Sequence, residues 1–367
     1  MKKLYIDRRY QFYELFNTDN GTLVRSNIWG TDKNPFRRSF PELIDVGIMG
    51  SCLAGKSGIC AKAGIDCYQR GATSLRRDMN LQDYEWIVKQ SRGKVFQIAL
   101  GGAGDPNKHE SFEQILKVTR DNDIVPNLTT SGYQLTDDEI GLIKQYCGAV
   151  AVSYYSKLIG ENEGNETTIK SIERLSAVGC ITNVHYVVSN DSIEEAIVRL
   201  EKNMFPDNIN AVIFLLYKPV GLGSVNKIVR NDVYFRRFIE VATSKSHPFK
   251  VGFDTCFTPA LINYGTNIDF SSVDACEAAR FSMYIDSELN AFPCSFDNLT
   301  GVFKFKLANA SGSMIEDAWN SDIFKDFLNR KAECCNCDKE NWCYGGCRLS
   351  LPINLCNNLS PHLHSFC

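Results

Sequence analysis

The feature that most constrains the fold is an alternation of apolar and amphipathic segments between about residues 43 and 220. Strands that alternate with helices of about 10–15 residues form a parallel sheet with crossover helices. We therefore expect an α/β fold with six βα units, either an open doubly wound sheet or a partial barrel. The expected strands are residues 43–49, 95–100, 124–130, 148–154, 181–189 and 211–217, and amphipathic helices are expected at 111–123, 137–147, 167–179 and 192–204.

The segments on either side of this region differ from it. Residues 10–29 read as a β-hairpin around Asn20 and Gly21, within an N-terminal extension at 1–42 that is too short for a domain. From about residue 250 the helical periodicity gives way to loops that carry cysteines. We expect three parts: the extension at 1–42, the βα region at 43–250 and a cysteine-rich domain at 251–367.

Composition limits the partners and the compartment. The chain has 367 residues and a net charge of -3, which gives no reason to expect nucleic acid as a partner. No apolar run reaches the roughly 18–20 residues of a membrane span, and the start MKKLYIDRRYQF lacks the apolar core of a secretory signal. We therefore expect a cytoplasmic protein without a membrane partner. Its 15 cysteines are then expected to bind metal or iron–sulfur groups rather than to form disulfides.

The cysteines gather at the two ends of the chain. The stretch GIMGSCLAGKSGICAKAGIDCYQRG (47–71) contains three cysteines; seven residues lie between the first and the second cysteine, and six between the second and the third. These three are Cys52, Cys60 and Cys67. Most of the others lie after residue 255, at positions 256, 276, 294, 334, 335, 337, 343, 347, 356 and 367.

The first three cysteines lie on the edge where a parallel sheet places its ligands. Cys52 lies three residues past the first expected strand, and the turn GGAGDP (101–106) follows the second. Ser131 and Ser153 stand at the ends of the third and fourth strands. Because the carboxyl ends of parallel strands share one edge, these groups are expected to form one site. An ordinary glycine-rich turn would explain GGAGDP alone, but not its place beside the cysteine loop.

A set of three thiolates suits a group with one open position. A [4Fe–4S] cube has four irons, so three cysteines leave one iron free to chelate a small molecule through an amine and a carboxylate. The alternative is a zinc site that takes a fourth ligand from elsewhere in the chain.

These motifs resemble the radical S-adenosylmethionine superfamily, whose members fold as a partial (β/α) barrel with a three-cysteine loop after the first strand. The resemblance implies a partial (β/α)6 TIM-like barrel. It also implies that a turn like GGAGDP holds the methionyl amino group of S-adenosylmethionine, and that Ser131 and Ser153 contact its ribose or carboxylate. The turn comprises Gly101, Gly102, Ala103, Gly104 and Asp105, with Asp where Glu is usual, followed by Pro106.

The spacing of the cysteine loop departs from the superfamily, whose usual gaps are three and two residues. Closing a loop costs only about 0.6 kcal/mol for each doubling of its length, so two doublings cost roughly 1–1.5 kcal/mol. Three glycines, Gly55, Gly58 and Gly64, relieve steric limits on the longer loop. The wider spacing is therefore compatible with the same iron–sulfur group.

The C-terminal stretch CCNCDKENWCYGGC (334–347) resembles the SPASM extension of the same superfamily, which carries two auxiliary [4Fe–4S] clusters. Its gaps of two, five and three residues would also fit a zinc knob on their own. Upstream, residues 276–294 resemble the segment that opens SPASM domains, except that Leu289 replaces a glycine, so we expect a different hairpin. The resemblance implies one cluster on Cys256, Cys276, Cys294 and Cys347, and another on Cys334, Cys337, Cys343 and Cys367, with Cys356 as the alternative last ligand.

The resemblance implies reductive cleavage of S-adenosylmethionine and modification of a peptide or protein, with three [4Fe–4S] clusters and an electron donor such as flavodoxin or ferredoxin. Our first hypothesis is a maturase that forms a thioether or carbon–carbon crosslink in a ribosomally made peptide. Because the N-terminal extension is short, either a separate leader-binding protein presents the peptide or no leader is needed.

Three alternatives remain open. Oxidation of a cysteine or serine, as in anaerobic sulfatase maturases, calls for an acidic base directly after the Pro-Cys, where this chain has Ser295 and reaches Asp297 only two residues later. A small-molecule dehydrogenase usually has fewer auxiliary ligands. A structural zinc or iron–sulfur protein leaves GGAGDP unexplained.

Four polar residues lie in or near the expected cavity without a clear role. Each of them fits a turn or packing position as well as a catalytic one, and no general base is assigned. They are Asp105, Tyr68, His185 and Lys218.

Overall fold

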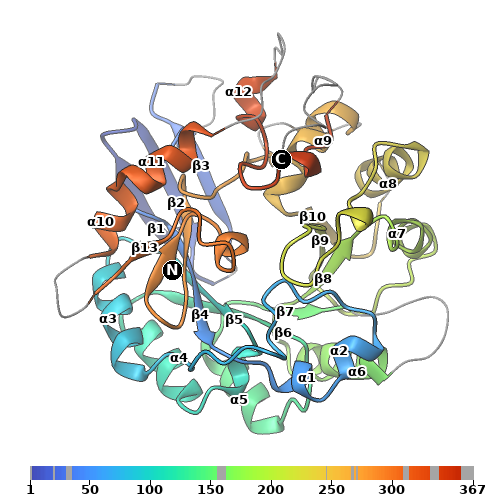
Figure 1. The fold of residues 1–367 in the computed structure, drawn as a ribbon, viewed down its shortest axis with the longest axis horizontal. Helices are drawn as coiled ribbons and strands as arrows, with labels where there is room; N and C mark the ends of the chain where they lie inside the picture. Colours follow the sequence, from blue (N-terminus) through green and yellow to red (C-terminus); the bar gives the residue numbers. More distant parts are fainter. Residues whose placement is uncertain are drawn as a thin grey trace.

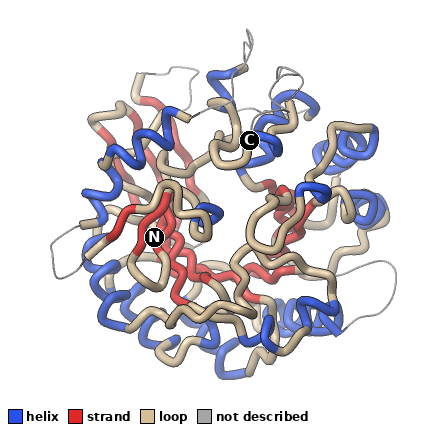
Figure 2. The backbone as a smooth tube through the Cα atoms, viewed as in Figure 1, coloured by secondary structure: helices blue, strands red, loops and turns tan. Residues whose placement is uncertain are grey.

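A curved sheet lined on its outside by helices forms most of the computed structural model (Figure 1, Figure 2). The structure describes residues 2–19, 21–29, 35–154, 163–244, 246–265, 268–269, 272–308, 314–330 and 339–356. No helix in these ranges is long and apolar enough to cross a membrane.

The six expected strands are confirmed, and all of them pair in parallel. They are β4 (Leu43–Met49), β5 (Gln97–Gly102), β6 (Val125–Thr130), β7 (Val150–Ser153), β8 (Thr182–Val188) and β9 (Ala211–Leu216). The helices beside them are α3 (Leu81–Ser91), α4 (Phe112–Asp121), α5 (Asp137–Tyr146), α6 (Glu163–Ala177), α7 (Ile193–Glu201) and α8 (Val233–Ser244). The expected partial barrel is thus present.

Short strands extend the sheet at both edges. The sheet order is β10-β9-β8-β7-β6-β5-β4-β11-β12-β13, in which β10 and β11 are parallel to their barrel neighbours. The added strands are β10 (Lys250–Phe253), β11 (Ser282–Ile285), β12 (Asn290–Phe292) and β13 (Phe305–Lys306). Runs of two to four residues carry too little periodicity to be found in the sequence. Because β11 pairs with β4, the cysteine-rich part is joined directly to the barrel; the expected domain boundaries stay predictions.

The two faces of the barrel sheet have different environments. Side chains alternate along each strand, so every second residue points to the same face. Ile44, Leu100 and Phe214 on the outer face are at most 2% exposed, because helices cover them. On the inner face, Asp45 and His185 are partly exposed. The inner face is therefore polar and reached by water, as a binding site requires.

Helix formation follows local signals in the sequence. Thr136 caps α5 in a capping box with Glu139, since each side chain accepts a hydrogen bond from the other residue's backbone N–H. In α7, Ile193, Ile197 and Leu200 fall on one face and are buried against the sheet.

The N-terminal residues form a separate antiparallel sheet, of β1 (Lys2–Asp7), β2 (Phe12–Asn17) and β3 (Leu23–Asn27). The expected hairpin is β2–β3, and Gly21 has the left-handed φ of 73° that its turn requires. Asn20 lies outside the described residues. The first strand was not expected. Phe16 stacks on Phe96, the residue directly before β5, with ring centroids 5.0 Å apart, which attaches this sheet to the barrel.

One arginine joins the N-terminal sheet, the barrel and the cysteine-rich part. The guanidinium of Arg25, on β3, lies 2.6 Å from Glu42, 2.7 Å from Asp274 and 2.8 Å from Glu277. Its side chain is 7% exposed and stacks over Phe281. Glu42 directly precedes β4, and Glu277 follows Cys276, so this cation fixes the start of both regions.

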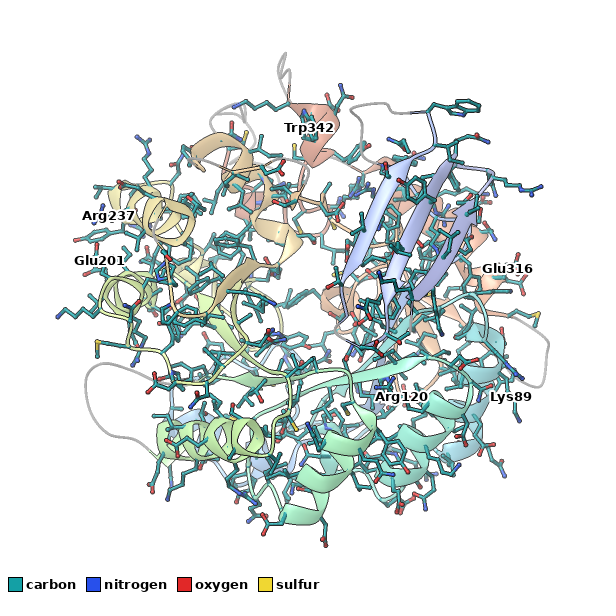
Figure 3. All side chains as sticks on the ribbon, turned by 180° about the vertical axis from the view of Figure 1, so that it is seen from behind. Lys89, Arg120, Glu201, Arg237, Glu316 and Trp342 are labelled. Carbon is teal, nitrogen blue, oxygen red and sulfur yellow. The ribbon has the colours of Figure 1, made fainter. Side chains whose placement is uncertain are left out.

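Replacing Arg25 by Met leaves Glu42 and Glu277 facing each other without their cation. Removing one partner of a buried ion pair lowers the free energy of unfolding by about 3–5 kcal/mol. Because Glu277 is partly exposed, we expect a loss at the lower end, about 3 kcal/mol. Urea denaturation followed by circular dichroism measures it. The control is Arg237→Met, because Arg237 pairs with Glu201 on the molecular surface (Figure 3) and such pairs contribute little. Equal urea midpoints for the two variants would contradict the role of Arg25.

Candidate functional site

The loop after β4 folds its extra residues into two helical turns. Cys52 is the N-cap of α1 (Leu53–Lys56), and its Sγ accepts a hydrogen bond from Gly55 N at 3.2 Å. Cys60 lies inside α2 (Ile59–Lys62). The Sγ of Cys67 accepts a bond from Gly71 N at 3.4 Å. The wide cysteine spacing is therefore filled by ordered backbone.

Two of the three loop glycines have the conformational role expected of them. Gly58 and Gly64 adopt φ values of 83° and 69°, in the left-handed region that favours glycine. Gly55 has no such φ; a Cβ there would approach the backbone and Cβ of Ala72 at about 3.0 Å. Its requirement is close packing rather than a left-handed turn.

The cysteine loop and the glycine-rich turn are pressed together. The N–H of Cys52 donates to the carbonyl of Gly71 at 3.0 Å. A Cβ on Gly71 would lie 2.0 Å from the Ala103 oxygen, and one on Gly104 would lie 2.3 Å from the Ser51 oxygen. Neither position has room for a side chain. The two sequence motifs therefore form one continuous wall at the carboxyl ends of β4 and β5.

The thiols of this loop share an electrostatic environment. Burial raises the pKa of Cys60 to about 11, and the nearby thiols of Cys52 and Cys67 and the carboxyl of Asp105 add to the shift. Burial likewise raises the pKa of Cys52. A metal ion or cluster that binds among these thiols would displace their protons. In the described ranges, no three His, Cys, Asp or Glu side chains already converge as ligands of a single ion.

The turn of the predicted cofactor site is tied to the next strand. Asp105 accepts hydrogen bonds from Ser131 N at 2.7 Å and from Ser131 Oγ at 2.5 Å. Burial raises the pKa of Asp105, and the bonds from Ser131 oppose that shift. Both side chains are therefore engaged with each other. Gly101 and Gly102 already lie at the end of β5, and a Cβ on Gly101 would meet nothing within 4 Å, so the backbone there is open to a ligand.

Ser153 and His185 face the interior from neighbouring strands. Ser153 ends β7, pairs with His185 of β8, and is partly exposed. Burial lowers the pKa of His185 to about 4, which keeps its imidazole neutral at pH 7. The contact of Ser153 with a cofactor stays a prediction.

A second group of thiols comes from four separate segments. Cys256 lies in the short 3₁₀-helix η3 (Thr255–Phe257) after β10, Cys294 follows β12, and Cys347 follows α12 (Glu340–Cys343). A hydrogen bond between the thiols of Cys256 and Cys347 raises the pKa of Cys256 and lowers that of Cys347. Burial raises the pKa of Cys294, and the nearby thiol of Cys276 adds to it.

The donor chemistry of this second group fits an iron–sulfur cluster. All four residues are free thiols that are partly or fully buried. The Sγ of Cys347 also accepts a backbone hydrogen bond from Ser350 at 3.4 Å. Soft sulfur donors with N–H groups directed at them are the environment of protein-bound clusters. The ligand set itself stays a prediction.

The third group is only partly visible. Cys343 is buried in α12. Cys334, Cys337 and Cys367 lie outside the described residues. The alternative ligand Cys356 accepts a hydrogen bond from Asn263 Nδ2 at 3.5 Å.

The hairpin between β11 and β12 keeps a left-handed turn without glycine. Leu289 has φ = 60°, a conformation that costs an L-residue roughly 1–2 kcal/mol. The two strands nevertheless form a regular antiparallel pair, in which Tyr284 lies opposite Phe292 and Ile285 opposite Ala291. What differs from a glycine-containing hairpin is therefore the residue type at the turn. Burial of the Leu289 side chain, which is 8% exposed, offsets the strain.

Several interior residues were missed by the sequence interpretation. Asp45 on β4 faces the interior, and burial together with nearby Glu277 raises its pKa to about 7. A charge at the third position of the apolar run LIDVGIM was the available signal. Phe296, two residues after Cys294, packs on Tyr68 with ring centroids 4.8 Å apart, and no local pattern predicts this contact between distant segments.

Comparisons with known proteins agree with this arrangement. Residues 276–339 match the SPASM iron–sulfur cluster-binding domain. SuiB from Streptococcus suis has a TM-score of 0.69 and 17% identity, over 94% of each chain. The structure of SuiB bound to its precursor peptide SuiA has a TM-score of 0.68 and 15% identity, over 95% of each chain. The structure of anSMEcpe with bound AdoMet and Cp18Cys peptide has a TM-score of 0.57 and 16% identity, over 84% of this chain and 89% of that one.

No curated protein sequence matches this chain. The match assigns residues 276–339 to the SPASM domain, and the solved structures confirm the expected partial-barrel α/β fold.

Gly71→Ala tests the contact between the cysteine loop and the glycine-rich turn. The new Cβ would overlap the Ala103 oxygen, so we expect a loss of about 1–3 kcal/mol in the free energy of unfolding. Gly141→Ala on α5 is the control, since a Cβ there meets nothing within 4 Å and alanine favours a helix by up to about 1 kcal/mol. Thermal unfolding of both variants under anaerobic conditions measures the difference. An unchanged melting temperature for Gly71→Ala would show that the two segments are not in contact.

Proposed function

We propose that this chain, which has the fold of the radical S-adenosylmethionine enzymes and a SPASM domain, cleaves S-adenosylmethionine reductively and uses the resulting radical to modify a peptide. The observation that carries the proposal is the packing of the three-cysteine loop against the glycine-rich turn through Gly71 and Gly104. That packing puts a three-thiolate site next to open backbone at Gly101, at the edge of a polar barrel interior.

Each segment then has a defined role. Cys52, Cys60 and Cys67 would hold a [4Fe–4S] cluster with one open iron, which supplies the electron that cleaves the cofactor. The open backbone at Gly101 would receive the methionyl amino group. Asp105 and Ser131 hold that turn in place through their mutual hydrogen bonds. The partly exposed interior beneath them would admit a substrate side chain.

A peptide substrate is supported by the solved structures of similar fold. SuiB has been solved with its precursor peptide SuiA and anSMEcpe with a peptide, and both matches extend over most of this chain. Formation of a thioether or carbon–carbon crosslink in a ribosomally made peptide is the reaction we propose. A flavodoxin or ferredoxin would deliver the electrons in the cytoplasm, and a separate protein would present a leader where the peptide has one.

Oxidation of a cysteine or serine is the second candidate, and the structure provides an observation against it. That reaction calls for an acidic base beside Cys294. Asp297 is fully buried, and its carboxylate accepts hydrogen bonds from Thr300 Oγ1, from Val302 N at 3.0 Å and from Phe303 N at 2.7 Å. A carboxylate saturated in this way stabilises its own loop and is not available as a base.

The iron content tests the cofactor assignment. Three [4Fe–4S] clusters predict about twelve irons in the anaerobically reconstituted chain, and about eight when Cys52, Cys60 and Cys67 are all replaced by Ala. The triple variant should release no 5′-deoxyadenosine under dithionite. One or two zincs without sulfide in the unaltered chain, or 5′-deoxyadenosine from the triple variant, would end this interpretation.

Cys367→Ala and Cys356→Ala distinguish the two candidates for the last auxiliary ligand. Pro352 lies in the short 3₁₀-helix η6 (Leu351–Ile353), and the thiol of Cys356 accepts a hydrogen bond from Asn263 Nδ2, so Cys356 already has a partner other than a cluster. We expect Cys367→Ala to lose about four irons, one cluster, and Cys356→Ala to lose none. Iron analysis and electronic spectra give the count, and the reverse pattern would assign Cys356 instead.

A further inference from the structure

A buried lysine lies where the barrel meets the cysteine-rich part. Lys218 follows β9, and its side chain is 4% exposed. Its Nζ lies 2.5 Å from the Oδ2 of Asp254 and donates to the carbonyl of Leu216 at 2.9 Å. Asp254 in turn precedes η3, which carries Cys256. The ammonium group is therefore held at a fixed place beside a cysteine-bearing turn.

Lys218 contacts residues that lie next to two of the four thiols assigned to the first auxiliary cluster. Asp254 lies two residues before Cys256, and Phe296, whose ring Lys218 also contacts, lies two residues after Cys294. Burial would lower the pKa of Lys218, but the ion pair with Asp254 raises it, so the lysine stays charged. A permanent positive charge thus lies within electrostatic range of the cluster site.

Cys276 has a different cation beside it. Arg280 donates to the carbonyls of Phe36 and Cys276. Arg280 therefore lies on the side of Cys276, whereas Lys218 lies on the side of Cys256 and Cys294.

Lys218 also touches the residues that connect the two cysteine sites. Its Nζ lies 4.6 Å from the centroid of the Phe296 ring, a cation–π contact. Phe296 packs on Tyr68 at 4.8 Å between centroids, and Tyr68 directly follows Cys67. A chain of contacts therefore runs from the three-cysteine loop through two aromatic rings to the ammonium group. Lys218 lies on the side of the auxiliary site that faces the radical chemistry.

We propose that Lys218 sets the reduction potential of the cluster held by Cys256, Cys276, Cys294 and Cys347, and thereby makes this cluster the electron acceptor. A cluster gains one negative charge when it is reduced, and a nearby fixed positive charge stabilises that form, more strongly in a partly buried site than in water. The negative charge of Asp254 lowers the reduction potential of the cluster, and it therefore limits how far Lys218 raises that potential.

The inference rests on the proposed function for its redox step. The substrate-centred radical gives up one electron and one proton as the new bond closes. A cluster held by these four thiols would take up the electron, and the proton would pass to water on the open inner face of the sheet. A higher potential at this cluster draws the electron away from the substrate.

A redox titration of the reconstituted full-length chain, read by electron paramagnetic resonance, tests the inference without substrate. The signal of the cluster is identified by its loss in Cys294→Ala. We expect Lys218→Met to increase the ratio of oxidised to reduced cluster at least tenfold at a fixed potential, which corresponds to about 59 mV for one electron. Asp254→Asn should shift the ratio the other way. Lys250→Met is the control, because Lys250 is an exposed lysine at the far end of β10.

A ratio for Lys218→Met within twofold of the unaltered chain, or a shift toward the reduced form, would overturn the inference. Where Lys218→Met does not retain the cluster, Asp254→Asn decides alone: a shift toward the reduced form supports the inference and no shift overturns it. The readout does not depend on cleavage of S-adenosylmethionine. A chain that shows these shifts but releases no 5′-deoxyadenosine would therefore refute the proposed function and the acceptor role, and would leave standing only that Lys218 sets the reduction potential.

Discussion

The arrangement of both cysteine sites depends on the buried ion pairs of Arg25. Its guanidinium meets carboxylates from the residue before β4 and from the residue after Cys276. Beside it, burial and the neighbouring Glu42 raise the pKa of Glu14, while the guanidinium of Arg38, 2.8 Å away, opposes that shift. One cation therefore compensates acids from segments far apart in the sequence. The start of β4 sets the position of the cysteine loop, and Cys276 is one of the four thiols predicted to hold the auxiliary cluster, so both share this anchor.

The sequence predicts what depends on local pattern. The strands β4 to β9 are long apolar runs separated by amphipathic helices, and this periodicity determines a parallel sheet with its ligands at the carboxyl edge. The meeting of the cysteine loop with GGAGDP follows from that edge alone. Strands β10 and β11 were missed because each has four residues and depends on pairing with strands already in place. Their existence is a tertiary effect.

The contacts that define the interior are not local. Lys218 and Asp254 are separated by 36 residues, and Tyr68 meets Phe296 across most of the chain. The carboxylate of Asp105 is engaged by Ser131, because an Asp side chain at that turn reaches the residue after β6; its contact with a cofactor stays a prediction. Leu289 shows the converse: the backbone keeps a left-handed turn where the sequence offers no glycine. Residue type alone indicates neither outcome.

The two cysteine sites differ in a way that matches the chemistry proposed for them. Cys52, Cys60 and Cys67 are all partly exposed and stand at the mouth of a polar interior. Cys276 and Cys347 are 7% exposed and are surrounded by the packed cysteine-rich part. An open iron must be reached by a small molecule, whereas a cluster that only stores an electron gains from exclusion of water, because nearby charges then act on it more strongly. Three partly exposed thiols at an open edge and a group of four thiols, two of which are buried, are therefore two solutions to two different requirements, and the contact of Tyr68 with Phe296 is where they meet.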